Sequence, residues 1–183
     1  MSTSEAVQEP RALVVFESMF GNTEQVARAV ADGLEAAGVP TRVSEVSRTP
    51  ADLPGSVDLL VLGAPTHAFS LSRPKTRIDA VRQGADLDKA AVGLREWLET
   101  AHPHRNHPVH VAVYDTRVSK VRRLPAAAGP SAARLAKRRG FTGVERPVAF
   151  LVDDLRGPLL DGEVERATAW GRSMAAEVSE VSR

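Results

Sequence analysis

The stretch ESMFGNTE, residues 17–24, is the part of the sequence whose residue types first suggest binding chemistry. It follows a short apolar run and precedes a helical pattern, so it is expected to form a strand-to-helix turn. Gly21 allows a ligand to approach the backbone closely, and Ser18, Asn22 and Thr23 add polar side chains. The free N–H groups of a first helical turn carry a partial positive charge. The turn therefore predicts a phosphate cradle that needs no lysine.

Two well-known nucleotide-binding turns are excluded at this position. The stretch has neither a glycine-rich loop ending in Gly-Lys-Ser/Thr nor the GxGxxG pattern, which argues against ATP and against a conventional dinucleotide fold. The residues leave one alternative open. An ordinary turn would need Asn22 only as a helix cap, with Gln25 completing a capping box.

The elements around this turn follow from the apolar pattern. Continuous apolar runs, typical of strands buried on both faces of a parallel sheet, lie at 12–16, 57–64, 109–115 and 144–153, and a weaker alternating run at 41–46 predicts an edge strand. Helical patterns lie at 22–38, 87–101, 131–140 and 161–178, with Ser131 and Asp161 as expected caps and Gly140 as an expected stop. The prolines within 47–56 leave room for a short helix or none. This order predicts an α/β fold with a parallel sheet covered on both faces.

Length and composition limit the class of protein. A chain of 183 residues suits one domain, expected over 11–180, with a disordered tail at 1–10 and another at 179–183. The net charge of +1 gives no reason to expect nucleic-acid binding by the whole chain. The absence of cysteine suits a cytoplasmic protein, and no apolar run is long enough to span a membrane.

Residues 11–34, RALVVFESMFGNTEQVARAVADGL, resemble the first strand, FMN phosphate loop and first helix of the flavodoxin family. Ser18, Gly21 and Thr23 match the family's loop pattern T/S-x-T-G-x-T, whereas Phe20 stands where a second hydroxyl is usual. The SMFG core is also similar to the SMYG of flavodoxin-like quinone reductases. The later stretches that carry the resemblance are 63–74, 114–120 and 158–171. It implies a three-layer sandwich with a five-stranded parallel sheet in the order 2-1-3-4-5 and helices on both faces.

The same resemblance implies where FMN would bind. The phosphate would lie against Ser18, Met19, Phe20, Gly21, Asn22 and Thr23. One side of the isoalloxazine ring would be lined by Pro65, Thr66, His67, Ala68 and Phe69. The other side would be lined by Asp115, Thr116, Arg117 and Val118. Either Phe69 or His67 could stack on the ring, but the second loop has no aromatic residue after Tyr114. One flavin face is therefore expected to be open to a substrate or covered by another subunit.

His67 is the candidate catalytic residue, because a histidine at the flavin edge could hydrogen-bond the ring or transfer a proton. A surface or capping histidine is the alternative. Glu17 would repel a phosphate, so its side chain is expected to point away from the cradle. The run HPHRNHPVH contains His102, His104, His107 and His110, but its prolines keep the backbone extended. A polar connection is favoured there, and no metal site is predicted.

Three functions are compatible with this reading. The first is an FMN-binding electron shuttle that serves a redox partner protein. The second is an NAD(P)H-dependent reductase of a small acceptor such as a quinone, for which a homo-oligomer is usual. The third is a flavodoxin-like domain that has lost flavin and acts as a binding or regulatory module. Basic residues flank the expected site and lean towards the reductase, unless they are ordinary solvated surface: Arg73, Lys75, Arg77, Arg117, Lys120, Arg122 and Arg123.

Overall fold

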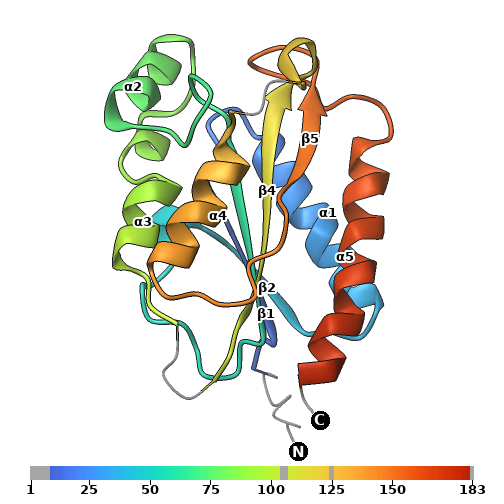
Figure 1. Ribbon diagram of the computed structural model, residues 1–183. Coiled ribbons are helices and arrows are strands. Elements are labelled where there is room, and N and C mark those ends of the chain that lie inside the picture. The colour runs from blue at the N-terminus through green and yellow to red at the C-terminus, as the bar shows by residue number, and fades with distance from the viewer. Residues whose placement is uncertain (1–8, 104–106, 124–125, 182–183) are drawn as a thin grey trace, which may run out of the picture.

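A computed structural model describes residues 9–103, 107–123 and 126–181; the tail expected over 1–10 lies almost wholly outside these ranges. The strands are β1 (Ala12–Phe16), β2 (Thr41–Glu45), β3 (Leu59–Pro65), β4 (His110–Val118) and β5 (Val148–Val152). They form one parallel sheet in the order β2-β1-β3-β4-β5, which confirms the predicted topology. All carboxyl ends of the strands therefore meet at one edge of the sheet, at the top of Figure 1.

Helices cover both faces of the sheet and make a three-layer sandwich (Figure 1). They are α1 (Asn22–Ala36), α2 (Pro74–Arg82), α3 (Leu94–Thr100), α4 (Ala128–Arg138) and α5 (Glu163–Val181). α1 and α5 pack on one face, α3 and α4 on the other, and α2 lies near the carboxyl ends of the strands. Short 3₁₀ turns lie at Val46–Arg48, Leu87–Ala90 and Ser119–Val121.

The unbroken apolar runs of the strands fill two cores at once. In β1, Leu13 and Val15 pack with α3 and α4, whereas Ala12 and Val14 pack with α1 and α5. Successive side chains of a strand point to opposite faces, so a strand with helices on both sides needs apolar residues at every position. This is the physical reason why continuous runs, rather than alternating ones, predicted the central strands correctly.

Two glycines bring α1 and α5 into close contact. A Cβ atom at Gly33 would lie 2.1 Å from the carbonyl oxygen of Thr168, and one at Gly171 would lie 2.2 Å from that of Val30. Neither position has room for a side chain, because the two helix backbones meet there directly. The contact fixes α1 against α5, and with it the start of α1 near the sheet edge.

The structure differs from the sequence prediction at several helix ends. α2 was not predicted, because its sequence PKTRIDAVR carries too few apolar residues to show a helical period. The helix expected over 87–101 is split into a 3₁₀ turn and α3. The expected cap Ser131 is wrong: α4 begins at Ala128, and the Ser131 hydroxyl donates to the Ala127 carbonyl, 3.0 Å away. α5 continues to Val181, so the C-terminal tail expected from 179 is helical over its first three residues.

Gly140 ends α4 as expected. Its φ of +90° is left-handed, and its N–H donates to the carbonyl of Lys137 at 3.1 Å. At the other end of the sandwich, the cap expected at Asn22 is wrong, since α1 is capped by Gly21 without a side-chain hydrogen bond. Asn22 is the first residue of the helix itself.

Candidate functional site

A pocket lies at the carboxyl edge of the sheet, where the loops after β1, β3, β4 and β5 meet. Most residues expected around a ligand line it: Ser18, Met19, Phe20, Asn22, Thr23, Pro65, Thr66, His67, Ala68, Thr116, Arg117 and Val118. Others were not expected: Thr76, Asp79, Ala80, Gln83, Val152 and Leu155. The structure thus brings together three segments that lie far apart in the sequence, and α2 and the β5–α5 loop complete the wall.

The turn before α1 has the geometry of an anion cradle. Gly21 is left-handed, with φ at +91°, and its N–H donates to the Ser18 hydroxyl oxygen at 3.1 Å. The first bond within the helix runs from the N–H of Gln25 to the carbonyl of Gly21, so the N–H groups before Gln25 have no acceptor inside α1. A Cβ atom at Gly21 would meet no heavy atom within 4 Å. There is open space beside the glycine, as a ligand bound to the backbone requires.

Thr23 joins this turn to the neighbouring strand. Its hydroxyl lies 2.8 Å from the hydroxyl of Thr116, and its carbonyl accepts a 2.9 Å hydrogen bond from the Tyr114 hydroxyl. Burial raises the pKa of Tyr114 well above its usual value, so the phenol remains a neutral donor. The Tyr114 ring occupies the space beside Gly63, where a Cβ atom would lie 2.1 Å from it. The Thr23 hydroxyl is therefore used within the protein, although the sequence suggested that it would face a ligand.

Asp115 lies beneath the pocket and is fully buried. Its carboxylate accepts hydrogen bonds from the Arg117 guanidinium at 2.6 and 2.5 Å and from the N–H of Gly129 at 3.0 Å. Asp115 was expected to line the ligand, but it does not line the pocket. Arg117 does line it, as expected. The pair also compensates the charge of Arg117, so this arginine adds less positive charge to the site than its sequence position suggests.

The loop after β3 forms a tight hairpin over the pocket. His67 and Ser70 exchange two backbone hydrogen bonds of 2.9 and 3.0 Å, and the residues between them, Ala68 and Phe69, have φ of +45° and +63°. Left-handed backbone costs a residue with a side chain about 1–2 kcal/mol. The hairpin holds Phe69 half-exposed at its tip, outside the pocket lining, while His67 and Ala68 line the pocket. Phe69 is thus not in a stacking position in this conformation.

His67 is set up as a neutral imidazole. Burial lowers its pKa, a hydrogen bond to the backbone of Thr76 opposes this shift, and the charge of Arg77 reinforces it. The imidazole is therefore predominantly uncharged near pH 7. A neutral ring that lines the pocket can accept a proton from a ligand or hydrogen-bond it. The candidate role of His67 remains a proposal.

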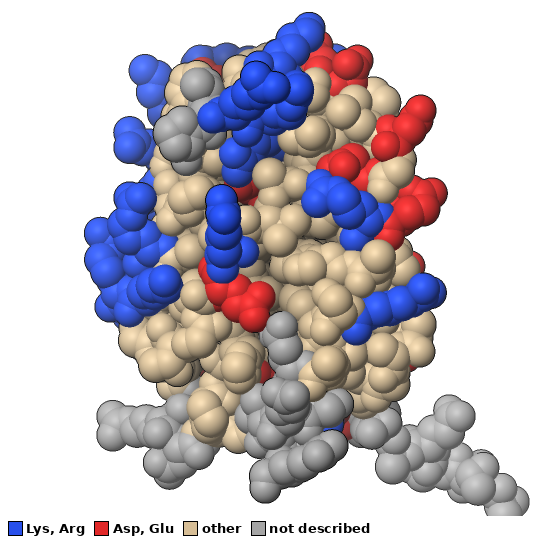
Figure 2. All heavy atoms as spheres, turned by 45° about the vertical axis from the view of Figure 1, so that its right-hand side comes forward, with Lys and Arg blue, Asp and Glu red and all other residues tan. Residues whose placement is uncertain are grey.

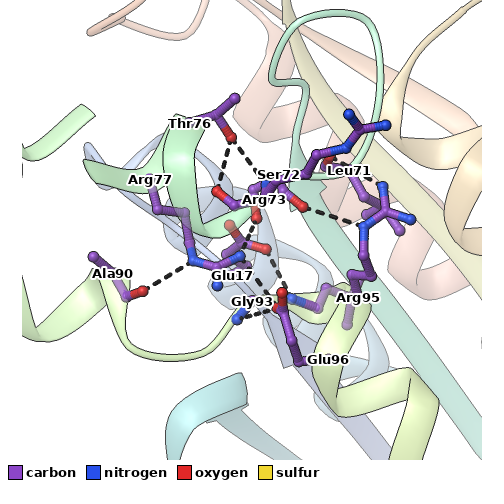
Figure 3. Close-up of polar contacts among 11 residues, drawn as sticks. Glu17, Leu71, Ser72, Arg73, Thr76, Arg77, Ala90, Gly93, Arg95 and Glu96 are labelled. Atoms are coloured by element: carbon purple, nitrogen blue, oxygen red, sulfur yellow. Dashed lines mark hydrogen bonds and ion pairs between the residues drawn. The ribbon is translucent and has the colours of Figure 1, made fainter. Parts of the chain in front are cut away.

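Sequence reasoning missed a buried ionic cluster behind the cradle (Figure 3). Arg77 was expected among the basic residues that flank the site, but it is only 1% exposed. Its guanidinium donates to the Ala90 carbonyl at 3.0 Å and to the Ser72 hydroxyl at 2.9 Å, and it lies 3.2 Å from the Glu96 carboxylate. Gly93 lies against the cluster, where a Cβ atom would be 2.3 Å from Arg77. No local pattern marks an arginine that is buried in this way.

Glu17 belongs to the same cluster. Its carboxylate accepts a 2.8 Å hydrogen bond from the N–H of Leu94 at the start of α3, so the side chain points away from the pocket as expected. Burial raises the pKa of Glu17, against the lowering effects of Ser72, Leu94 and Arg77, and Glu96 raises it further. An acid directly after a buried strand was the one signal in the sequence for this cluster. The cluster ties the end of β1 to α2 and α3, directly beside the cradle.

The β5–α5 loop lies against the other side of the cradle. Its Arg156 guanidinium donates a hydrogen bond to the carbonyl of Gln83 at the end of α2. A Cβ atom at Gly157 would lie 2.3 Å from the Asn22 side chain, so this loop packs directly on the first residue of α1. Both contacts join segments more than seventy residues apart, and neither could be inferred from local sequence.

The described residues of the histidine-rich run, 102–103 and 107–110, lie at the opposite end of the sheet from the pocket. His107 and Asp58 are joined by a 2.8 Å contact, and the same carboxylate pairs with Arg11. His104 lies outside the described residues. Among the residues that are described, no three potential metal ligands gather at one point. Likewise, none of the helices described here has the length and apolarity needed to cross a membrane.

Comparison with known proteins gives the class to which this fold corresponds. The family model for flavodoxin matches residues 14–81, which include the cradle, the His67 hairpin and all but the last residue of α2. A flavodoxin from the domain Archaea is similar over 92% of this chain and 98% of its own, with 17% identity and a TM-score of 0.61. A WrbA-like flavodoxin from Agrobacterium tumefaciens is similar over 94% and 99%, with 16% identity and a TM-score of 0.55.

The flavodiiron protein of Giardia intestinalis is similar over 93% of this chain but only 36% of its own, with 14% identity and a TM-score of 0.56. No curated protein matches this chain by sequence. The chain has the flavodoxin fold, and the resemblance to the flavodoxin family inferred from residues 11–34 is confirmed.

Proposed function

We propose that this protein binds FMN in the pocket at the carboxyl edge of the sheet and acts in electron transfer. The observation that carries the proposal is the cradle: a left-handed Gly21 beside open space, at the start of α1, between Phe20 and Asn22, which line the pocket. Bound FMN would supply one- and two-electron redox chemistry, and the chain would supply binding, orientation and access. We take residues 11–180 to be the folded unit that does this, in the cytoplasm, as the absence of cysteine favours.

The residues present fit a phosphate-bearing, partly apolar ligand. The backbone N–H groups at the start of α1 suit a phosphate, and Pro65, Ala68, Val118 and Val152 offer apolar walls further along the pocket. His67, uncharged near pH 7, is the group that we expect to hydrogen-bond the ligand or move a proton. Thr66 is held in place by the N–H of Ala128, which donates to its hydroxyl at 3.1 Å.

Between a shuttle and an NAD(P)H-dependent reductase of quinone-like acceptors, we favour the reductase. At the end of β4, the pocket is lined by Thr116, Arg117 and Val118, none of them aromatic, and Phe69 lies outside the lining. One face of a planar ligand would thus be left without an aromatic cover, which leaves space for a small acceptor or for a second subunit. Steady-state reduction of a quinone with NADPH or NADH, measured on FMN-loaded protein, tests this choice.

Titration of the ligand-free protein with FMN, FAD and riboflavin, followed by flavin fluorescence, tests the proposal itself. A cradle for one terminal phosphate predicts that FMN binds most tightly and riboflavin at least about tenfold more weakly. Equal affinity for riboflavin and FMN would contradict the role of the cradle.

The second candidate is a flavodoxin-like module without flavin. It is favoured by Phe20, which replaces a hydroxyl in the cradle and packs against Met19 and Ala80 of the small apolar cluster under α2. The same titration separates the candidates, because a module of this kind would bind none of the three flavins.

A further inference from the structure

Charge is distributed very unevenly along this nearly neutral chain. Residues 116–146 contain nine Lys and Arg but a single acid, Glu145, which gives this segment a net charge of +8. The other 152 residues contain 15 Lys and Arg and 22 Asp and Glu, a net charge of −7. The overall value of +1 therefore hides two regions of opposite sign. Such an asymmetry produces a local field that attracts partners of one charge.

The fold gathers this charge on one surface, made by the β4–α4 connection, α4 and the segment before β5. Its exposed members, here called the basic face, are Lys120, Arg122, Arg123, Arg134, Lys137, Arg138 and Arg146. Figure 2 shows Lys and Arg crowded along the top and one side of the molecule, with many of the acids in view on the other side. Within the part of the chain that the structure describes, none of these seven pairs with a carboxylate, whereas Arg28, Arg82 and Arg166 on other surfaces do.

The basic face also has an apolar centre. A groove between α4 and the segment 144–147 is lined by the apolar residues Pro130, Ala133, Val144 and Pro147, by three basic residues, Arg134, Lys137 and Arg146, and by one acid, Glu145. An apolar centre with a polar rim is the usual anatomy of a protein–protein interface. Three of the seven basic residues, Arg134, Lys137 and Arg138, lie on α4, so this part of the face is carried by a helix of the sandwich.

We propose that the basic face docks a carboxylate-rich surface of an acidic protein. The described large apolar residues that are exposed, Phe69, Ile78, Leu87 and Leu155, all lie outside it. Among the described residues, the face therefore offers no exposed aromatic side chain for stacking nucleic-acid bases and no exposed large apolar side chain for insertion into a lipid bilayer.

The position of the basic face beside the pocket gives docking a consequence. Arg117 lines the pocket near the end of β4, and Lys120 lies in the 3₁₀ turn that directly follows this strand. A partner on this face would come to rest at the rim of the pocket. The docking itself requires no bound flavin, so the docking proposal can be tested independently of the proposed function.

The test is a pair of matched charge reversals. One triple variant, Arg134→Glu, Lys137→Glu and Arg138→Glu, reverses the basic face. The control, Arg42→Glu, Arg48→Glu and Arg172→Glu, makes the same change of net charge at exposed arginines elsewhere. Binding of fluorescent poly-L-glutamate at low salt is the measurement, with thermal unfolding to verify the fold. We expect the wild type and the control to bind with similar affinity, the face variant roughly tenfold or more weakly, and all binding to weaken with salt.

Three results would overturn the proposal: no binding of poly-L-glutamate by the wild type, equal losses in the two triple variants, or tighter binding of a short DNA duplex or phosphatidylserine vesicles than of poly-L-glutamate. If the face variant does not fold, the milder set Lys120→Gln, Arg122→Gln and Arg123→Gln replaces it, with Arg42→Gln, Arg48→Gln and Arg172→Gln as its control, and the same outcomes apply. FMN titration of each variant shows separately whether the pocket is intact.

Discussion

The hydroxyls of Thr23 and Thr116 lie 2.8 Å apart in the buried layer under the pocket, although 93 residues separate them. One belongs to the first turn of α1 and the other to the end of β4. This hydrogen bond joins the cradle to the opposite wall of the pocket, and the Tyr114 hydroxyl, bonded to the Thr23 carbonyl, reinforces the connection.

Removing either hydroxyl should destabilise the protein, because the remaining one stays buried without its partner. Thr23→Val and Thr116→Val keep the side-chain shape, and each should lower the free energy of unfolding by about 1–2 kcal/mol. The double variant should lose less than the sum of the two, since both partners are then apolar. Urea unfolding of the four proteins measures this, and strictly additive losses would show that the two hydroxyls do not interact.

Gly21→Val should abolish FMN binding while the domain still folds. The left-handed backbone at Gly21 strains valine by about 1–2 kcal/mol, and its side chain would fill the open space at the cradle. Gly38→Val is the matched control, since Gly38 has φ of +83° and equal open space, but lies at the other end of α1. Both variants should lose similar stability in urea, and only Gly21→Val should lose FMN in a titration. Similar FMN affinities would mean that Gly21 serves the turn alone.

Arg117→Gln should destabilise the protein much more than Arg122→Gln. The first removes the ion-pair partner of a fully buried carboxylate, Asp115, which should cost roughly 3 kcal/mol. The second removes an exposed charge that pairs with no carboxylate among the described residues, and should change stability by less than about 0.5 kcal/mol. Adding Asp115→Asn to Arg117→Gln should recover part of the loss. Chemical unfolding at neutral pH distinguishes these results, and equal effects of the two arginine changes would refute the assigned pairing.

Glu17→Gln should alter how stability depends on pH. Burial raises the pKa of Glu17 in the folded protein, so the folded state keeps this proton to higher pH than the unfolded chain. The stability contributed by the neutral carboxyl is complete below the ordinary pKa of 4.5. It is lost as the pH rises through the higher pKa that Glu17 has in the folded protein. Glutamine stays neutral, so the variant should be more stable than the wild type near pH 7, and this advantage should vanish in acid.

Unfolding free energies of wild type and Glu17→Gln across this pH range test the assignment. Glu165→Gln, at an exposed position of α5, is the control and should follow the wild-type pH profile closely. If Glu17→Gln instead loses stability at neutral pH, the assignment is wrong. The contacts of the charged carboxylate with Arg77 and the N–H of Leu94 would then stabilise the fold by more than the burial of the charge destabilises it.

The sequence alone determined the sheet and the cradle, since both depend on neighbouring residues. Runs such as ALVVF and LLVLGA are apolar at every position because helices cover both faces, and this property is local. Ser18 and Gly21 lie three residues apart, so one turn brings them together whatever the rest of the chain does. Most of the expected site residues line one pocket mainly because all parallel strands end at the same edge.

Only the tertiary structure decided which polar groups face the pocket and which serve the interior. Arg77 and Arg117 both belong to the basic residues that flank the expected site in the sequence. In the structure, however, Arg77 is buried against Ser72 and Glu96, whereas Arg117 pairs with Asp115 and lines the pocket. The wall formed by α2 was missed for the same reason, because its polar sequence has no helical period of its own. Burial and partnership depend on residues that meet only after the chain has folded, and no local pattern encodes such a meeting.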